Sequence, residues 1–261
     1  MISATALILT YNEEANIGRT LAALAGIDEV VIIDSGSSDA TVAIAKSAHR
    51  NVRIVDRPFD THTRQWNFGL EQIRTPWVLA LDADYELSQE LAEEIARLTP
   101  PDELAGYKAN FEYRIFGRSL RACVYPPRTV LFRRDKGQYR DDGHTQILET
   151  DAEVLPLAGK IFHDDRKPLS RWIHSQDRYA ALEARHLLSM QVEQLSFQDR
   201  LRRKIVFAPP AMFLYLLFAR GLIFDGWPGW FYVCQRTIAE LLLSIRLLIE
   251  KKNLETRKAE D

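Results

Sequence analysis

The chain has little cysteine. Its 261 residues include only Cys123 and Cys234, and no CxxC pair. This scarcity excludes a disulfide framework and a cysteine-rich zinc site. The first residues also lack the basic segment and cleavage site of a secretory signal, so we expect a reducing, cytoplasmic location.

A strong excess of charge and a long apolar run are absent as well. The net charge is −2, so no basic field indicates a nucleic-acid partner. No GxGxxG follows an early apolar run, which argues against a dinucleotide-dependent oxidoreductase. The apolar run at residues 205–219 is broken by Pro209-Pro210 and is shorter than the ~20 residues that span a bilayer. An interfacial, re-entrant or buried segment suits it better.

Short apolar runs alternate with helical patterns over the first hundred residues. Strands are predicted at residues 4–10, 29–34, 52–55 and 77–81, with helices between them and a helix capped by Ser88 after the last. Asn12 is predicted to cap the first helix, whose apolar stripe is Ile17, Leu21 and Leu24. This order predicts a doubly wound, mostly parallel α/β sheet that binds ligands beyond the carboxyl ends of its strands.

Acidic and polar residues fall at that ligand edge. Thr10-Tyr11-Asn12-Glu13 follows the first strand, Asp34 ends the second, and Asp82-Ala83-Asp84 ends the fourth. Each alone is an ordinary turn former, but together they indicate a site. Asp82 and Asp84 could hold a hard divalent cation together with diphosphate oxygens. Asp34 could accept a hydrogen bond from a nucleotide base, and Tyr11 could stack on that base.

These segments resemble a known family. ILTYNEEANI, VVIIDSGSSDAT and WVLALDAD are very similar, in order and spacing, to three signatures of family 2 glycosyltransferases with the GT-A fold. The resemblance implies transfer with inversion, in which a carboxylate deprotonates the acceptor hydroxyl, and a Mn or Mg cofactor. The implied nucleotide-binding residues are Thr10, Tyr11, Asn12, Glu13, Asp34 and Asp82, and the implied metal ligands are Asp82 and Asp84.

A second resemblance covers residues 140–184. RDDGHTQIL and IFHDDRKPLSRWIHSQDRYAALEA look like the subgroup that builds lipopolysaccharide core and related envelope glycans. Many members carry a His-Glu pair where this chain has His144-Thr145. Asp142, and after it Asp141, is therefore our candidate for the catalytic base, against the alternative of a turn rich in Asp and Gly.

The segment after residue 160 adds further candidates. His163 could complete the metal shell, since imidazole is an acceptable manganese ligand, or could instead bind diphosphate or cap a turn. Arg166 and Lys167 are candidate phosphate contacts.

The C-terminal third is predicted to be helical. A long helix after Trp227 carries an apolar stripe opposite its polar residues Arg236, Glu240 and Glu250; the stripe is Phe231, Cys234, Ile238, Leu241, Leu242, Ile245, Leu248 and Ile249. Basic residues flank this region on both sides, at 200–204 and 251–258. We expect it to lie on the membrane surface, peripheral to the inner face of the plasma membrane. A helix pair packed on the catalytic domain and a dimer interface are the competing interpretations.

The sequence thus predicts a domain at 1–169 and a helical, membrane-proximal region at 170–261. Within the domain, residues 1–100 form the nucleotide-binding half, and 101–169 form a mixed-sheet extension on the acceptor side. The predicted activity is transfer of a hexose from a nucleotide diphosphate sugar, by family habit a UDP-sugar, to a glycan or lipid-linked acceptor in envelope polysaccharide or lipopolysaccharide synthesis.

Two alternatives remain open. A non-catalytic, membrane-bound scaffold would keep the nucleotide pocket and lack the base. An aspartyl-phosphate phosphatase also carries DxD, but normally on the first strand and followed by Thr or Val, whereas here Tyr85 follows the pair.

Overall fold

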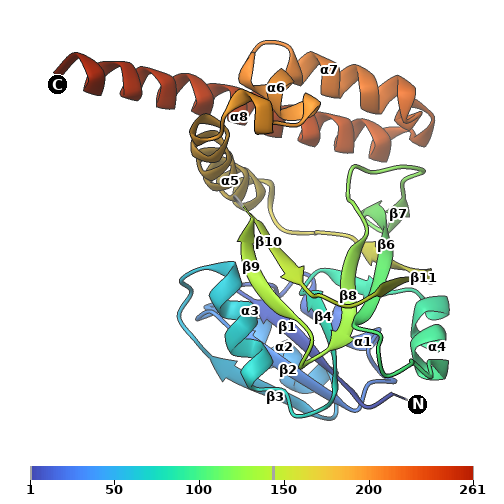
Figure 1. Ribbon diagram of the computed structural model, residues 1–261. Helices are drawn as coiled ribbons and strands as arrows, with labels where there is room; N and C mark the ends of the chain where they lie inside the picture. The colour runs from blue at the N-terminus through green and yellow to red at the C-terminus, as the bar shows by residue number, and fades with distance from the viewer. Residues whose placement is uncertain (1, 143–144, 261) are drawn as a thin grey trace. The chain divides into compact units, whose positions relative to one another are not determined.

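The computed structural model describes residues 2–142 and 145–260 (Figure 1). The chain divides into two compact units. The first comprises the chain up to Ser119 together with Val124–Lys167, and the second comprises Leu120–Cys123 together with Pro168–Asp261.

The first unit contains a nine-stranded mixed sheet. Along the sheet the order is β3 (Val52–Asp56), β2 (Glu29–Asp34), β1 (Ala4–Thr10), β4 (Trp77–Asp82), β8 (Arg128–Arg133), β6 (Gly106–Ile115), β11 (Val154–His163) and β5 (Tyr85–Leu87), with β7 (Arg118–Ser119) beside β6. β3, β2, β1 and β4 are parallel, and β8 runs antiparallel to β4. The predicted mixed extension is therefore confirmed. A separate antiparallel ribbon joins β9 (Gln138–Asp142) to β10 (Thr145–Glu149).

Helices cover both faces of the parallel strands. Successive side chains of a strand point to opposite faces. Ala6 and Ile8 of β1 belong to the core cluster that includes side chains of α1 (Ile17–Ala22), α2 (Thr41–Ala48) and α4 (Gln89–Arg97). Leu7 belongs instead to the cluster with Trp66 and Leu70 of α3 (His62–Glu71). The doubly wound α/β prediction is confirmed.

Local capping agrees with the prediction at one helix and not at another. The Ser88 hydroxyl accepts a hydrogen bond from the Leu91 amide at 3.1 Å and caps α4 as expected. Asn12 does not cap α1, which begins later, after Asn16. Asn12 has a positive φ of 54°, and its side-chain oxygen accepts from the Ser38 amide at 2.7 Å. It therefore ties the loop after β1 to the loop after β2.

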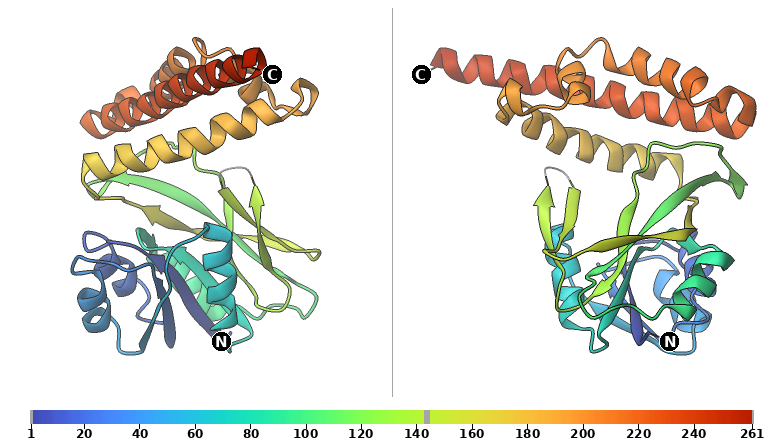
Figure 2. Two further views of the ribbon diagram at one scale, coloured as in Figure 1. Left: turned by 90° about the vertical axis from the view of Figure 1, so that its left-hand side faces the viewer. Right: turned by 45° about the vertical axis from the view of Figure 1, so that its right-hand side comes forward.

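The second unit is helical (Figure 2). Its main helices are α5 (Leu169–Ser189), α6 (Phe197–Arg203), α7 (Ala208–Leu214) and α8 (Trp227–Glu260), with short turns η1 (Val192–Gln194), η2 (Tyr215–Ala219) and η3 (Leu222–Asp225). Ala184 and Leu187 of α5 pack with Leu243 and Leu247 of α8 in one buried cluster. Among residues 2–142 and 145–260, no helix has the length and apolarity needed to cross a bilayer.

One polar residue of α8 differs in its placement from the sequence prediction. Glu240, which we placed on the polar face, is buried and accepts hydrogen bonds from the Arg202 guanidinium of α6 at 2.7 and 3.2 Å. Several residues of the predicted apolar stripe, including Ile238, Leu241, Ile245 and Leu248, are exposed, which is compatible with the expected position of the stripe against a membrane surface. Within the second unit the helix packs instead through a second apolar face at Val233, Leu243 and Leu247.

Candidate active site

The parallel strands bring the predicted donor-site residues to one edge of the sheet. In the β1–β2 register Thr10 pairs with Asp34, and in the β1–β4 register Leu9 pairs with Asp82. The carboxyl ends of three neighbouring strands therefore deliver Thr10, Asp34 and Asp82 side by side. This edge is where open α/β sheets bind their ligands.

Asp34 is buried and strongly hydrogen-bonded. One carboxylate oxygen accepts from the Thr10 hydroxyl at 2.9 Å and from the Ser37 hydroxyl at 2.6 Å. The other accepts from the backbone amides of Gly36 at 3.0 Å and Ser37 at 2.8 Å. A carboxylate has about four acceptor positions, so these bonds fill them. Asp34 therefore shapes the loop after β2, and a nucleotide can reach its oxygens only by displacing a hydroxyl.

Tyr11 and Glu13 differ sharply in exposure. The Tyr11 side chain, which follows β1 at this edge of the sheet, is 51% exposed. Glu13 is buried, and its carboxylate accepts hydrogen bonds from Asn16 at 2.9 Å and from the Lys167 ammonium at 2.9 Å. Burial raises the pKa of Glu13 by more than the Lys167 charge lowers it.

Asp84 lies at the centre of a charged cluster. Its Oδ2 is 3.4 Å from His163 Nε2 and 3.5 Å from Lys167 Nζ. Burial opposes ionisation of Asp84, but the His163 and Lys167 charges outweigh it and lower the pKa of the carboxyl. The pKa of Lys167 is raised, because Asp84, Glu13 and Asp165 together outweigh the effect of burial.

His163 is the last residue of β11 and is surrounded by aromatic rings. It pairs with Tyr113 of β6 and with Tyr85 of β5 in the sheet. Its ring centroid lies 4.6 Å from that of Tyr113, 5.0 Å from Tyr125 and 5.2 Å from Tyr85. Its Nδ1 is buried and has no hydrogen-bond partner among the described residues. These rings fix the imidazole so that Nε2 faces Asp84.

The side chains around Asp84 fit a divalent ion whose remaining ligands would come from a diphosphate. Among residues 2–142 and 145–260, no group of three or more His, Cys, Asp and Glu side chains forms a protein-only cage. Magnesium sites at phosphate substrates commonly use one or two carboxylates, with phosphate oxygens and waters for the rest. Asp84 Oδ2 and His163 Nε2, which lie 3.4 Å apart, could supply one carboxylate and one imidazole to such an incomplete shell. Asp82 is the last residue of β4, two residues before Asp84, and is only partly buried.

Arg128 is a site residue that sequence reasoning missed. Arg128 is the first residue of β8, which runs antiparallel to β4, and its charge interacts with that of Asp82 at the end of β4. Its guanidinium lies over the Tyr125 ring at 5.1 Å from the centroid. It thus places a cation near Asp82. No residue pattern indicated Arg128, because the antiparallel pairing of β8 with β4 cannot be inferred from the pattern of one strand.

In the loop after β11, the two predicted phosphate contacts, Arg166 and Lys167, point to different partners. The Arg166 guanidinium binds the Asp164 carboxylate at 2.7 Å, and Asp164 also accepts from the Gly117 amide at 2.8 Å. Arg166 is therefore paired with Asp164 and does not point to the sheet edge where Thr10, Asp34 and Asp82 lie, which we call the donor edge. Lys167, in contrast, points to Glu13 and Asp84.

The two candidates for the catalytic base, Asp142 and Asp141, belong to the β9–β10 ribbon. The Asn67 side-chain amide of α3 donates a hydrogen bond to the Tyr139 carbonyl at 2.9 Å and accepts one from the Tyr139 amide at 3.0 Å. These two bonds hold the ribbon to that helix. Asp141 is exposed and accepts a hydrogen bond from the Thr63 hydroxyl at 2.5 Å. The backbone of Asp142 pairs with Thr145, but the Asp142 side chain and His144 lie outside the described residues.

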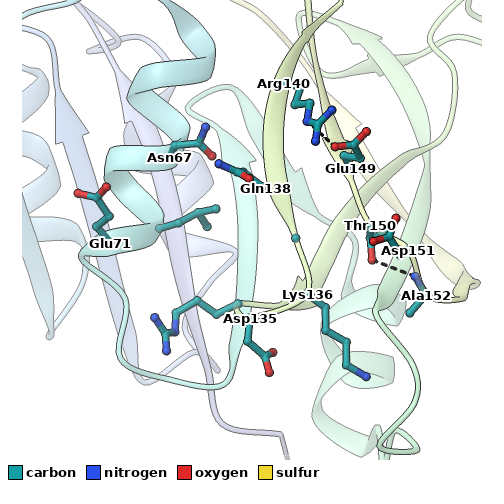
Figure 3. A pocket seen from close by; sticks show the side chains of 13 residues that line it. Asn67, Glu71, Asp135, Lys136, Gln138, Arg140, Glu149, Thr150, Asp151 and Ala152 are labelled. Carbon is teal, nitrogen blue, oxygen red and sulfur yellow. Dashed lines mark hydrogen bonds and ion pairs between the residues drawn. The ribbon is translucent and has the colours of Figure 1, made fainter.

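A large open cavity at this ribbon is lined by none of the predicted donor-site residues. It measures about 720 Å³, and its lining includes Glu71, Lys136, Gln138, Glu149 and Asp151 (Figure 3). Arg134, also in the lining, donates its amide to the Pro76 carbonyl just before β4 begins. The cavity therefore lies toward the amino end of β4, at the opposite end of that strand from Asp82.

Comparison with known proteins assigns the family. The profile described as Glycosyl transferase family 2 matches residues 5–143. A lipopolysaccharide core biosynthesis glycosyltransferase, LpsC of Rhizobium meliloti, is 31% identical over 238 residues, covering 86% of this chain and 84% of that protein. An uncharacterized glycosyltransferase of Rickettsia typhi, RT0209, is 26% identical and covers 85% of this chain and 78% of its own.

Solved structures were also compared. Glucosyl-3-phosphoglycerate synthase from Mycobacterium tuberculosis, solved with Mn²⁺, UDP and glucosyl-3-phosphoglycerate, is 18% identical with a TM-score of 0.47, over 72% of this chain and 79% of that one. TarS of S. aureus in complex with UDP-GlcNAc is 15% identical with a TM-score of 0.43, over 97% and 92%. The family assignment rests on the sequence matches, which cover more than half of the chain. The chain belongs to glycosyl transferase family 2.

Proposed function

We propose that this family 2 glycosyltransferase transfers a hexose from a UDP-sugar, with inversion, to a hydroxyl of a lipopolysaccharide core or related envelope glycan. The observation that carries the proposal is the meeting of Thr10, Asp34 and Asp82 at one sheet edge, with Asp84 and His163 adjoining. The similarity to LpsC over most of both chains supports the acceptor class.

In this proposal the donor lies across the carboxyl ends of β1, β2 and β4. The exposed Tyr11 ring stacks on the base, and the loop held by Asp34 and Asn12 lines the nucleoside pocket. Asp82 and Arg128 flank the sugar and diphosphate. Asp84 and His163, with Asp82 beside them, would hold Mn²⁺ or Mg²⁺, which supplies Lewis-acid neutralisation of the departing diphosphate.

The chemical step is a single displacement. The acceptor oxygen forms a bond to the anomeric carbon while the bond from that carbon to the diphosphate oxygen breaks, and its electron pair leaves with UDP. A carboxylate of the β9–β10 ribbon takes the acceptor proton. Asp142 remains our first candidate for that base. Asp141 is the second, and its hydrogen bond from Thr63 must open before its Oδ1 can act.

A panel of nucleotides tests the donor assignment. A cognate donor stabilises the folded state by mass action, so the melting temperature should rise with UDP and one UDP-sugar in the presence of Mn²⁺. Asp84→Asn should remove the Mn²⁺-dependent part of that rise. Stabilisation by GDP or CDP alone would refute the UDP assignment.

Turnover then separates the enzyme from the alternatives. The wild type should release UDP from the stabilising sugar nucleotide in the presence of a truncated lipopolysaccharide acceptor, and Asp142→Asn should not. Equal background release by both proteins would favour the non-catalytic scaffold. Phosphate release from a phosphomonoester would favour a phosphatase.

We further propose that the second unit binds the surface of an anionic bilayer. Trp227, Trp230, Ile238, Leu241 and Ile245 recur at helical spacing along α8 and are all exposed. The chain segment 168–261 carries 14 Lys and Arg against 10 Asp and Glu, whereas the whole chain has a net charge of −2. An apolar stripe on a basic, helical unit is complementary to anionic lipid, and tryptophan favours the headgroup region.

A further inference from the structure

Lys167 forms ion pairs with three carboxylates at or beside the edge where Thr10, Asp34 and Asp82 meet. Its ammonium is 2.9 Å from Glu13 Oε1, 3.5 Å from Asp84 Oδ2 and 3.5 Å from Asp165 Oδ1. An ammonium has three donors, and here three carboxylates surround it. The side chain is 19% exposed, so water screens these contacts only in part.

The surrounding loop holds Lys167 in this position. The Asp165 carboxylate accepts the Lys167 backbone amide at 3.0 Å and the Asn16 side-chain amide at 3.3 Å. Asn16 in turn donates to Glu13 at 2.9 Å and accepts the Arg166 amide at 3.2 Å. The end of the β11 loop is thus tied to the start of α1, and its lysine is directed at the donor edge.

This position conflicts with a divalent ion on Asp84. A hard cation sits about 2.0–2.2 Å from a carboxylate oxygen, so an ion on Oδ2 would lie within about 6 Å of an ammonium that is 3.5 Å from the same oxygen. His163 Nε2 approaches that same oxygen at 3.4 Å. Two cations at that separation in a largely buried site repel each other. Binding of the ion therefore requires the ammonium to move or to gain new anionic partners.

We propose that Lys167 is a built-in counter-ion that occupies the acidic donor edge until the nucleotide arrives and thereby makes metal binding depend on the diphosphate. The flexible four-carbon stem lets the ammonium leave Asp84 and pair with a diphosphate oxygen. The diphosphate brings the negative charge that both cations need. Lys167 would then act as a positioning residue that orders metal and donor binding. This inference rests on the proposed function, because it requires a metal and a nucleotide diphosphate at this edge.

Mn²⁺ titration of the full-length protein tests the inference, with free Mn²⁺ followed by electron paramagnetic resonance, with and without UDP. In the wild type, UDP should tighten Mn²⁺ binding by at least tenfold. Lys167→Met removes the charge at nearly constant length, so it should tighten Mn²⁺ binding without UDP by about tenfold and shrink the effect of UDP. Lys167→Arg keeps the charge and should retain the dependence on UDP.

The controls separate this inference from the proposed function. Lys160→Met removes another β11 cation, which pairs with Glu112 at 3.6 Å, and should leave both Mn²⁺ affinities unchanged. Circular dichroism reports whether each variant folds. If Lys167→Met does not fold, Lys167→Gln, whose amide can still donate to Glu13, takes its place. Equal Mn²⁺ affinity of the neutral variant and the wild type without UDP would overturn the role of Lys167. Failure of the wild type to bind Mn²⁺ even with UDP would overturn the metal-dependent function, and this inference with it.

Discussion

Helix α8 has two apolar faces, and the adjacent residues Leu247 and Leu248 lie on different ones. Leu247 is 0% exposed and packs in the cluster with Ala184 and Leu187 of α5, whereas Leu248 is 51% exposed. Truncating a buried leucine to alanine costs about 2–5 kcal/mol, because transfer free energy is lost and a cavity remains. Truncating Leu248 should change the free energy of unfolding by less than about 0.5 kcal/mol.

For binding to lipid we expect the opposite: Leu248→Ala should weaken binding more than Leu247→Ala. Leu248→Ala removes three carbons, worth about 0.8 kcal/mol each when transferred from water to hydrocarbon. Since the side chain is about half exposed, roughly half of that gain, about 1.2 kcal/mol, is available to the bilayer. Loss of 1.2 kcal/mol corresponds to a roughly eightfold weaker partition coefficient. Leu247→Ala should leave the partition coefficient of the folded protein nearly unchanged.

Two assays decide between these outcomes. Urea unfolding gives the free energy of each variant, and co-flotation with phosphatidylglycerol vesicles gives the partition coefficient. Phosphatidylcholine vesicles serve as the uncharged control and should bind less protein. Equal destabilisation by the two substitutions would show that the face assignment is wrong. Unchanged flotation of Leu248→Ala, with a shift from dimer to monomer in sedimentation, would show that the stripe joins two copies of the chain.

Two further predictions concern the first unit. A Cβ on Gly159 would stand 2.4 Å from the Leu91 Cα, so Gly159→Ala should destabilise by about 1–3 kcal/mol in urea unfolding; Gly26→Ala, with nothing within 4 Å, should not. The hydrogen bond from the Arg57 guanidinium lowers the pKa of Asp60 from 3.8 to about 2. Its stabilising contribution is therefore complete above the unfolded-state value and is lost as pH falls through about 2. Asp60→Asn should flatten that part of an acid-unfolding curve, and salt should weaken the effect because the pair is exposed.

The positions of β1, β2 and β4 followed from the sequence because each of these parallel strands is a nearly continuous apolar run with polar turns on either side. The predicted strand at 29–34 coincides with β2, and Asp34 falls at its end as expected. Helix faces were harder to predict. A helix with two apolar stripes has no single periodic signal, so the sequence indicated only the stripe containing Leu241, which we expected to face a membrane, and the packed face containing Leu243 was missed.

Contacts between distant segments could be predicted where parallel strands end at one edge, as for Thr10, Asp34 and Asp82, but not elsewhere. Arg128 comes near Asp82 because β8 returns antiparallel to β4, and Lys167 meets Glu13 across 154 residues of sequence. Spacing identified Lys167 as a candidate phosphate contact but gave no reason to separate it from Arg166. The difference is set by Asp164, which pairs with Arg166 and leaves its neighbour to the donor edge.

The carboxylates of Asp34 and Asp82 differ in how many hydrogen bonds they accept from the protein. This difference predicts that substituting them will have different effects on stability and on UDP affinity. Asp34 accepts four hydrogen bonds, two of them from backbone amides, so Asp34→Ala should cost about 1–3 kcal/mol of stability as well as UDP affinity. Asp82 accepts no hydrogen bond within the described part of the chain and is partly exposed, so Asp82→Ala should lower UDP affinity at nearly unchanged stability. Urea unfolding and calorimetric UDP titration in Mn²⁺ measure the two quantities independently. Strong destabilisation by Asp82→Ala would mean that this carboxylate serves the fold, and the donor contact would then have to come from Asp84 and Arg128.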